Sequence, residues 1–439
     1  MEIEKRTNIR FVILFIIFFI TVLSFADRTA ISIAGDAISN DFAINHITLG
    51  YIFSAFGWTY AIGQIPGGLL VDKFGPKKVY TVLTFVWAFL LIVHSIIDLV
   101  PVFMMVSVFI VLRAIVGVIS APMFSINSRV VAEWFPTTER AMATSVYTSA
   151  QYLSIIIFAP LIGVLSTTIG WQYVFLIIGC VMLLLSLFWM SYFDLPRQHK
   201  RINESERNYI QGKPHLPANT PQEKIIFDQN PIAQLLKNRM TFGIYFGQYC
   251  SAVTSYFFMT WFPIFLIEEK GLTVAEAGFY TIFPAIGGFI GSLMGGAISD
   301  KFVQKGYTLT FSRKFPIIVG LFISSTVFFS IFIDSVVLVI VMMSLVLWGR
   351  GFSGLGWTLI TETVPKRFIG INSGIFNTFS NFAGITTPII IGILFEWTDS
   401  FFYPLLFVSI HCILAIISYG WIVSDLKELK LNYHVVEES

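Results

Sequence analysis

The sequence predicts an all-α integral membrane protein, with twelve transmembrane helices in two pseudo-symmetric bundles of six. Of the 439 residues, 56% are hydrophobic and only 12% are charged, about half the charged fraction of a soluble domain. Apolar runs of the ~20 residues needed to cross a bilayer recur along almost the whole chain. These runs are continuous rather than alternating at every second residue, which excludes a β-barrel.

Six apolar runs predict an N-terminal bundle within residues 1–193, and six more predict a C-terminal bundle with a cytoplasmic tail within residues 240–439. The first six lie at 11–34, 48–71, 79–97, 100–124, 142–167 and 171–193. The last six lie at 240–267, 275–299, 314–334, 336–361, 368–394 and 402–424. The polar stretch between the bundles, residues 194–239, predicts a cytoplasmic linker with a short helix near Ile232–Leu236.

The positions of the basic residues predict the orientation in the membrane. If both termini are cytoplasmic, all but four of the 28 Lys and Arg residues fall on cytoplasmic segments. The exceptions are Arg28, Arg113 and Arg350 inside the membrane and Lys270 outside. This is the positive-inside pattern, and the opposite orientation would invert it. The net charge of +2 therefore reflects topology and contact with the lipid bilayer, and does not indicate binding of nucleic acid.

Three arginines and one aspartate are predicted to lie at membrane depth. Asp27 and Arg28 are adjacent in the first span, and Arg113 and Arg350 lie near the middle of the fourth and tenth spans. A charge in a membrane helix costs about 2.5–3.5 kcal/mol on insertion scales, so such residues usually have a function. Guanidinium groups match carboxylate geometry, which favours an anionic substrate. The alternative is that these arginines extend to a membrane interface.

Asp27 is the one acid clearly embedded with these cations, and it is predicted to exchange protons. Arg28 points about 100° away around the helix, so Asp27 can face Arg113 while Arg28 faces a cavity. Burial favours the neutral carboxyl group and a nearby arginine favours the carboxylate. A substrate anion that competes for the arginine would therefore allow Asp27 to take a proton. The alternative is a static ion pair that joins two helices.

Uncharged polar groups at membrane depth are candidates for binding the hydroxyl groups of a sugar acid. Asn377 and Asn381 lie four residues apart, on one face of the eleventh span. The other candidates are Tyr60, Gln151, Gln248 and Trp357. Amides and phenols suit hydroxyl groups, and an indole face suits the C–H groups of a polyol. For each of these residues the alternative is a role in helix packing.

The loops after the second and eighth spans repeat one pattern. Gly68 precedes Asp72-Lys73-Phe74 in the first half, and Gly296 precedes Asp300-Lys301-Phe302 in the second. An acid at the C-terminal end of a helix needs compensation from cations or from the positive end of another helix dipole, so the loop is a candidate cytoplasmic latch. With Gly75, this loop resembles the signature of the major facilitator superfamily, and the six-plus-six arrangement resembles that superfamily over the full length.

Several short runs resemble the anion:cation symporter branch of this superfamily, in particular bacterial glucarate/galactarate and related galactonate and hexuronate transporters. These runs are Ala26-Asp27-Arg28, 50–58, 64–68, 134–136 with Glu139-Arg140, 246–249 and 260–263. The resemblance implies import of a sugar-acid anion with protons across the bacterial inner membrane by alternating access. It implies a proton site at Asp27, paired with Arg113. It also implies substrate contacts from Arg28, Tyr60, Gln151, Gln248, Trp357 and Asn377. The charge of Arg350 and the polar side chain of Asn381 at membrane depth make these two residues further candidates.

The expected gate consists of Asp72, Lys73, Gly75, Arg140 and Asp300.

We expect no enzymatic activity, because no nucleophile–base pair or metal-ligand spacing occurs at membrane depth. Neither a cofactor nor a metal is expected, with protons as the coupling ion. A small organic anion and the lipid bilayer are the expected partners, and the functional unit is expected to be a monomer.

One departure from the resembled branch concerns proton coupling. Its members usually carry an acid two turns after the arginine of the fourth span, where this chain has Ser120. Moving one charge costs ~2.3 kcal/mol per 100 mV, and a dianion needs two protons for electroneutrality. Either the substrate is effectively a monoanion, or a second proton binds elsewhere, or coupling is weak. The alternative functions are an organic-anion or phosphate-ester exchanger with weak proton coupling, and a non-transporting membrane receptor.

Overall fold

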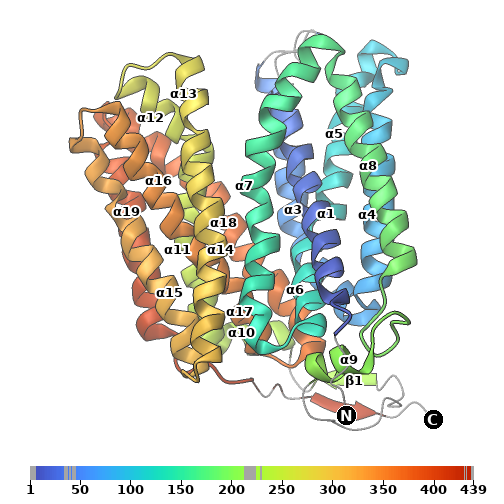
Figure 1. Ribbon diagram of the computed structural model, residues 1–439. Helices are drawn as coiled ribbons and strands as arrows, with labels where there is room; N and C mark the ends of the chain where they lie inside the picture. Colours follow the sequence, from blue (N-terminus) through green and yellow to red (C-terminus); the bar gives the residue numbers. More distant parts are fainter. Residues whose placement is uncertain are drawn as a thin grey trace.

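The computed structural model of the chain is almost entirely helical. It describes residues 6–33, 38, 41, 46–211, 224–227, 230–429, 431 and 433–436. Figure 1 shows two groups of helices side by side, which we call the N-terminal bundle (α1 to α8) and the C-terminal bundle (α11 to α19). The short elements α9, α10 and β1 all lie at the same end of the two bundles, which we call the linker end.

The N-terminal bundle follows the first six predicted spans. Its elements are α1 (Ile9–Ile33), α3 (His46–Phe74), α4 (Pro76–Ser95), η1 (Ile97–Leu99), α5 (Val102–Ser120), α6 (Met123–Trp134), α7 (Thr137–Thr168) and α8 (Trp171–Tyr192). The fourth span was predicted too short, because α6 continues beyond residue 124 to Trp134. The break between α5 and α6 lies at Pro122, whose ring and missing N–H interrupt a helix.

The C-terminal bundle repeats this arrangement with more breaks. Its elements are α11 (Arg239–Thr260), α12 (Phe262–Glu268), α13 (Val274–Tyr280), α14 (Ile282–Gln304), α15 (Leu309–Ser324), η2 (Ser325–Phe332), α16 (Val336–Phe352), η3 (Ser353–Leu355), α17 (Gly356–Glu362), η4 (Lys366–Phe368), α18 (Ile369–Thr398), α19 (Phe402–Ile417) and η5 (Ser418–Ile422). The seventh predicted span, 240–267, corresponds to two helices, α11 and α12, which meet at an angle of 53°. Pro263 lies in the first turn of α12, where a proline starts a helix but cannot continue one.

The predicted helical membrane fold is confirmed. Among the described residues, ten helices are long and apolar enough to cross a membrane, and the bent pair α11 and α12 is an eleventh candidate. The second predicted span coincides with α3, a helix of 29 residues that is not among these ten. Large apolar side chains such as Phe15, Phe89 and Leu184 are exposed, as expected for surfaces that lipid covers. The end of the first predicted span, at residue 34, lies outside the described residues.

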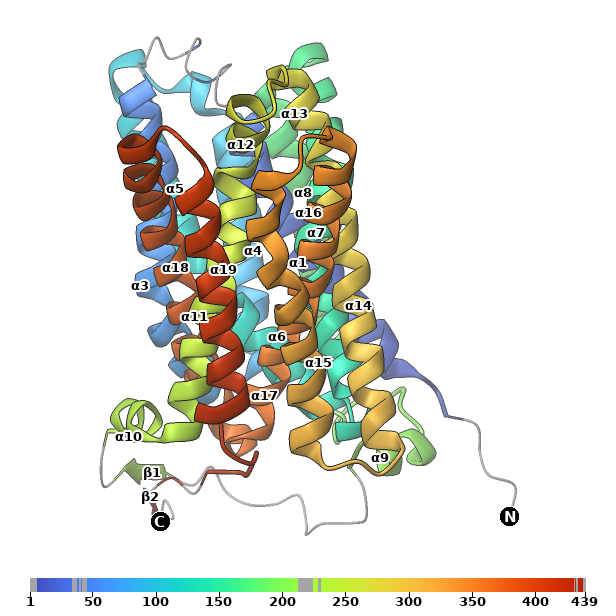
Figure 2. The ribbon, with the colours of Figure 1, turned by 90° about the vertical axis from the view of Figure 1, so that its left-hand side faces the viewer.

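The linker contains more regular structure than predicted. The expected short helix is present as α10 (Pro231–Lys237), but α9 (Glu204–Gln211) and β1 (Lys224–Phe227) were not predicted. β1 pairs antiparallel with β2 (Tyr433–Val436), a small sheet that the all-α prediction did not include. Figure 2 shows the two strands beyond the ends of the helices. Residues 212–223 and 228–229 of the predicted linker lie outside the described residues.

Helix α9 is anchored to the N-terminal bundle by a buried ion pair. Arg10 of α1 contacts Glu206 of α9 at 2.9 Å and Glu139 of α7 at 2.9 Å. Burial raises the pKa of Glu206, but hydrogen bonds from Thr7 and from the backbone of Ile9 outweigh it, so the pKa lies below its ordinary value. A lowered pKa means that the carboxylate stabilises the fold above pH ~4.5, and that this contribution is lost as the pH falls through the lower folded-state pKa. At neutral pH the anchor is therefore fully charged.

The two bundles meet through two pairs of helices. α3 packs against α18, and α7 packs against α14. The first pair is the second and eleventh spans and the other is the eighth and fifth spans, so the repeat relates one pair to the other. Polar residues on these four helices can therefore face the other bundle, and so can those on α1 and α11 that lie beside them.

Candidate functional site

Asp27 of α1 and Arg113 of α5 form an ion pair inside the N-terminal bundle. Arg113 Nη1 lies 2.9 Å from Asp27 Oδ1, and the indole Nε1–H of Trp87 donates to Asp27 Oδ2 at 3.3 Å. The side chains of Asp27 and Arg113 are 0% and 2% exposed. The predicted pairing of these two residues is therefore present. Breaking such a buried pair typically costs about 3–5 kcal/mol, because one charge is left uncompensated.

Arg28 has no ion-pair partner among the residues that the structure describes. Its guanidinium carbon lies over the rings of Phe25, Phe56 and Tyr60, at 4.9, 4.8 and 4.5 Å from their centroids. Arg28 Nε and Nη2 are buried, and neither has a hydrogen-bond partner within the described part of the chain. Aromatic faces attract the cation but accept no in-plane hydrogen bond. Within the described part of the chain, the N–H groups at Nε and Nη2 are therefore available to bind an anion.

Residues from both bundles complete a polar cluster beside Arg28. Asn377 of α18 donates from Nδ2 to Tyr60 Oη at 3.2 Å and to Gln64 Oε1 at 2.7 Å. Tyr256 of α11 interacts electrostatically with both Tyr60 and Arg28. We call Arg28, Tyr60, Gln64, Tyr256 and Asn377 the polar cluster.

The predicted residues Asn381 and Gln248 lie on helices of the polar cluster, α18 and α11, whereas Gln151 lies on α7, and the three have different surroundings. Asn381 accepts a hydrogen bond from the hydroxyl of Tyr256 at 3.3 Å, which places it at the edge of the polar cluster. Gln248 of α11 donates to Ser380 of α18 at 3.2 Å, within the C-terminal bundle. Gln151 is half-buried on α7. Contact of these three residues with substrate stays a prediction.

Arg350 differs from Arg28 in that its donors are used within one bundle. Its Nε donates to the carbonyl oxygen of Ser251 at 2.8 Å, and its Nη1 donates to the hydroxyl of Ser353. These bonds join α11 to the break between α16 and α17. The sequence predicts the same role, binding of the substrate anion, for Arg350 and Arg28. The structure shows that Arg350 also joins helices of one bundle. Its role in anion binding stays a prediction.

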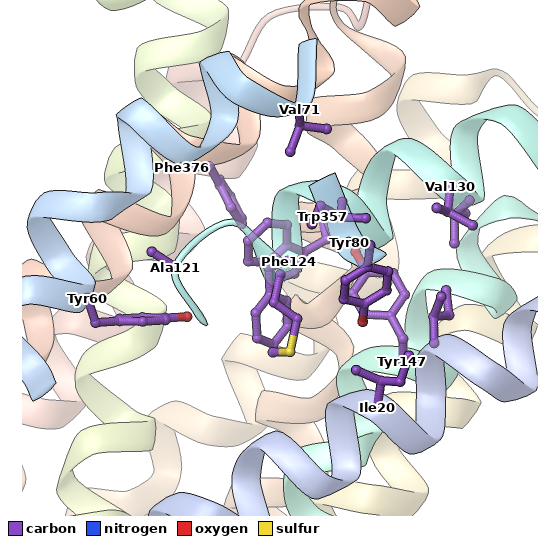
Figure 3. Close-up of a cluster of buried hydrophobic side chains, with 14 of the residues drawn as sticks. Ile20, Tyr60, Val71, Tyr80, Ala121, Phe124, Val130, Tyr147, Trp357 and Phe376 are labelled. Atoms are coloured by element: carbon purple, nitrogen blue, oxygen red, sulfur yellow. The ribbon is translucent and has the colours of Figure 1, made fainter. Parts of the chain in front are cut away.

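Trp357 lies in an aromatic cluster between the bundles. Its ring stacks on Phe124 of α6, with centroids 5.0 Å apart and planes at 25°, and meets Phe376 of α18 edge-on at 4.8 Å. Figure 3 shows these three rings packed together, with Tyr60 at the edge of the group. The indole is only 6% exposed. Trp357 therefore seals the contact between the bundles in this structure, and its predicted contact with a polyol is untested.

Asp72 joins the two bundles at the linker end. Its carboxylate accepts the backbone N–H of Gly370 at 2.8 Å and that of Ile371 at 2.7 Å, both at the start of α18. The first N–H groups of a helix have no partner within the helix and carry partial positive charge. Arg129 adds a longer ion pair at 3.7 Å. This is the compensation that the sequence pattern predicted for the acid.

Asp300 makes the equivalent contact in the opposite direction. It accepts the backbone N–H groups of Ala141 and Met142, at 3.2 and 2.7 Å, near the start of α7. Asp300 also pairs with Arg313 at 2.7 Å, and Arg313 pairs with Glu362 at 2.8 Å. Two acids, one from each bundle, thus hold the other bundle's helix terminus and close the linker end.

The remaining predicted gate residues have smaller parts in these contacts. Gly75 has a φ of +79° at the turn into α4, a conformation that favours glycine. The ammonium group of Lys73 lies 5.2 Å from the ring centroid of Phe74. Arg140 of α7 reaches Glu362 at 3.9 Å, a long ion pair between the bundles.

Replacing Gly68 with alanine is expected to open the linker end. A Cβ atom at Gly68 would lie 2.2 Å from the carbonyl oxygen of Gly370, and this backbone atom can move only if the bundles separate. Spin labels at the exposed positions Lys78 and Lys305, in a cysteine-free background, measure the separation. We expect the distance distribution to shift to longer values. Gly57→Ala in the same helix is the matched control, since nothing lies within 4 Å of its Cβ position. An unchanged distance in the Gly68 variant would refute this gate.

Several residues of the site were not identified from sequence. Gln64 lies one turn after Tyr60 on the same face of α3, and this spacing was an available signal. Trp87 and Tyr256 gave no comparable signal, because aromatic residues are abundant in every span. Arg313 and Glu362 carry charges close to the ends of predicted spans. Their sequence positions alone do not show that they meet Asp300.

Comparison with known proteins supplies the family. The family model described as Major Facilitator Superfamily matches residues 17–388. A probable galactarate/D-glucarate transporter of Bacillus subtilis (strain 168) is 41% identical over 431 residues, covering 98% of this chain and 95% of that protein. A protein of Escherichia coli (strain K12) with the same description is 39% identical over 437 residues, covering 98% and 97%. Among solved structures, the proton:xylose symporter XylE matches with a TM-score of 0.68 at 16% identity, covering 94% of this chain and 96% of that one.

Proposed function

Because the chain belongs to the major facilitator superfamily, we propose that it imports a sugar-acid anion, of the glucarate or galactarate type, together with protons. Membership makes it a multi-pass membrane transporter rather than an enzyme. The observation that carries the choice of an anion is Arg28, whose Nε and Nη2 atoms are buried without a partner among the described residues, beside the Tyr60–Asn377 contact between the bundles. The names of the similar bacterial proteins support a sugar acid as that anion.

Substrate binding follows from the chemistry of the polar cluster. The planar guanidinium of Arg28 offers two parallel N–H groups to a carboxylate, an arrangement that is roughly twice as strong as a neutral hydrogen bond. Gln64 Nε2 is buried and has no partner among the described residues, so it can donate to a substrate hydroxyl. Tyr60 and Asn377 come from different bundles and already share a hydrogen bond. A sugar acid bound here would contact both halves of the transporter, as alternating access requires.

Proton coupling is proposed to use the Asp27–Arg113 pair. The guanidinium of Arg113 lies over Phe56, the same ring that Arg28 covers, so the pair and the anion site are neighbours. A substrate carboxylate at Arg28 adds negative charge near Asp27 and competes for Arg113. Both effects favour the protonated form of Asp27. Protonation then removes the charge that holds Arg113, which allows α1 and α5 to move relative to each other.

We place the linker end in the cytoplasm of a bacterium, at its inner membrane, with both termini on that side. The distribution of the 28 Lys and Arg residues supports this orientation. In the present state, Asp72 and Asp300 close the cytoplasmic side, so substrate would enter from outside. Rocking of the N-terminal bundle, residues 1–193, against the C-terminal bundle, residues 240–439, would then expose the site to the cytoplasm. We propose that a monomer performs this cycle, with no cofactor other than the coupling proton.

A panel of substrates in proteoliposomes with an imposed pH gradient tests the proposed function. Glucarate, galactarate, galactonate and hexuronates are compared with a phosphorylated sugar, and we expect uptake of at least one sugar acid above that of protein-free vesicles. Exchange of the phosphorylated sugar alone would instead support a phosphate-ester exchanger. The structure does not favour that function, because the described helix α11 carries no Lys or Arg after Arg239 to bind a second phosphate charge. Binding without any uptake would support a receptor.

A further inference from the structure

A cavity of about 690 Å³ lies at the linker end, outside the polar cluster. Its walls come from three parts of the chain. The N-terminal bundle contributes Glu133 and Arg140, the linker contributes Arg197 and Tyr209, and the C-terminal bundle contributes Lys366. The cavity therefore adjoins the contacts that close the linker end.

Cations outnumber acids in this cavity, and one of them is poorly paired. Glu133 is already bound by Arg129 at 3.1 Å and by Lys366 at 3.3 Å. The Arg140 side chain is only 12% exposed, and its Nε is buried without a hydrogen-bond partner in the described residues. The other contacts of Arg140 are long, at 3.9 Å to Glu362 and 3.4 Å to the carbonyl oxygen of Phe135.

The acid that pairs with Arg140 among the described residues has a closer partner. Glu362 forms a closer, two-point contact with Arg313, at 2.8 and 3.1 Å. A buried guanidinium whose N–H groups lack good acceptors is costly, and an anion in the adjoining cavity would satisfy it. Arg197 is exposed and reaches the same cavity from the linker, while Leu195 and Ile210 provide apolar wall.

We propose that this cavity binds a small soluble anion with phosphate or carboxylate oxygens, bridging Arg140 and Arg197 to Lys366. Because Lys366 belongs to the C-terminal bundle and the arginines do not, the anion has all of its ligands only when the linker end is closed. A ligand that binds one state better shifts the population toward it. The anion therefore inhibits opening of the transporter on the linker side. This last step rests on the proposed transport function, whereas the binding site does not.

Thermal unfolding of the purified full chain tests the binding site. Inorganic phosphate and succinate are titrated against chloride at equal ionic strength. We expect at least one of the two to raise the unfolding temperature, and the Arg197→Ala/Lys366→Ala variant to show an apparent Kd at least about tenfold higher. Lys366 is 54% exposed and Arg197 is exposed, so this variant is expected to fold. Lys200→Ala removes an exposed cation from the same loop and is the matched control, in which Kd stays unchanged.

Arg28→Gln separates this cavity from the polar cluster. Stabilisation by the anion must persist in the Arg28→Gln variant, because the proposed site does not include Arg28. The proposal is overturned if neither anion stabilises the protein more than chloride does, if the Arg197→Ala/Lys366→Ala variant binds as the wild type does, or if stabilisation is lost in Arg28→Gln.

Transport assays test the inhibitory step separately. Phosphate on the linker side of reconstituted protein is expected to lower the maximal uptake rate at least twofold with little change in KM, and Arg197→Ala is expected to weaken this effect. An equal effect in both proteins would overturn the regulatory step. If no sugar acid is transported at all, the proposed function fails, whereas the unfolding experiment still decides whether the anion site exists.

Discussion

Replacing Asp27 with asparagine is expected to abolish accumulation of sugar acid driven by a pH gradient. Asparagine keeps the shape of the side chain but cannot take up and release a proton, so the step that couples the two fluxes is lost. Exchange of labelled for unlabelled substrate, which needs no net proton movement, is expected to continue. Both quantities can be measured in the same proteoliposomes, with and without the gradient.

A stability effect must be separated from this functional effect. Asp27→Asn leaves Arg113 buried without its anionic partner, and such a change typically costs about 3–5 kcal/mol. The Asp27→Asn/Arg113→Gln variant removes both charges and is expected to recover part of this stability without recovering accumulation. Accumulation by Asp27→Asn at the wild-type level would show that the proton binds elsewhere.

Arg28→Gln is expected to weaken substrate binding roughly 10- to 150-fold, which corresponds to losing ~1.5–3 kcal/mol of a charge-assisted interaction. The folded protein is expected to lose little stability, because Nε and Nη2 of Arg28 have no hydrogen-bond partner to lose among the described residues. Affinity and unfolding temperature are both measured on the purified variant. Arg28→Lys keeps the charge but not the planar fork, so an intermediate affinity is expected.

Arg350→Gln is the matched control for this variant. Arg350 donates to Ser251 and Ser353 within the C-terminal bundle, so its loss is expected to lower stability more than the loss of Arg28. If Arg28→Gln binds substrate with unchanged affinity, then the polar cluster is not the anion site.

The features that could be predicted from sequence are those in which a charge stands out against an apolar background. Asp27 and Arg113 carry opposite charges at similar depth, and pairing lowers the free-energy cost of placing each charge in the membrane. The latch at Asp72 was predictable because its pattern recurs at Asp300, and both acids do meet a helix terminus. Burial of a charge therefore limits the possible partners strongly enough for sequence reasoning to find them.

Features that depend on helix rotation or on distant segments could not be predicted. Arg28 and Arg350 have the same side chain in similar apolar surroundings, yet one faces three aromatic rings and the other faces Ser251. The contact of Trp357 with substrate stays a prediction, and its packing against Phe124 and Phe376 on two other helices was not predicted. The strand pairing of β1 with β2 joins segments that are more than 200 residues apart. Hydropathy places a helix in the membrane but does not determine which neighbour each face will meet.

The most direct test of the account counts protons and sugar acid in one experiment. Proteoliposomes that enclose a pH-sensitive dye receive labelled glucarate, or whichever sugar acid of the panel is taken up. Proton symport predicts that uptake acidifies the lumen, that an inward proton gradient drives accumulation, and that a protonophore abolishes this accumulation. Uptake that leaves the lumen pH unchanged and is insensitive to the protonophore would contradict proton symport.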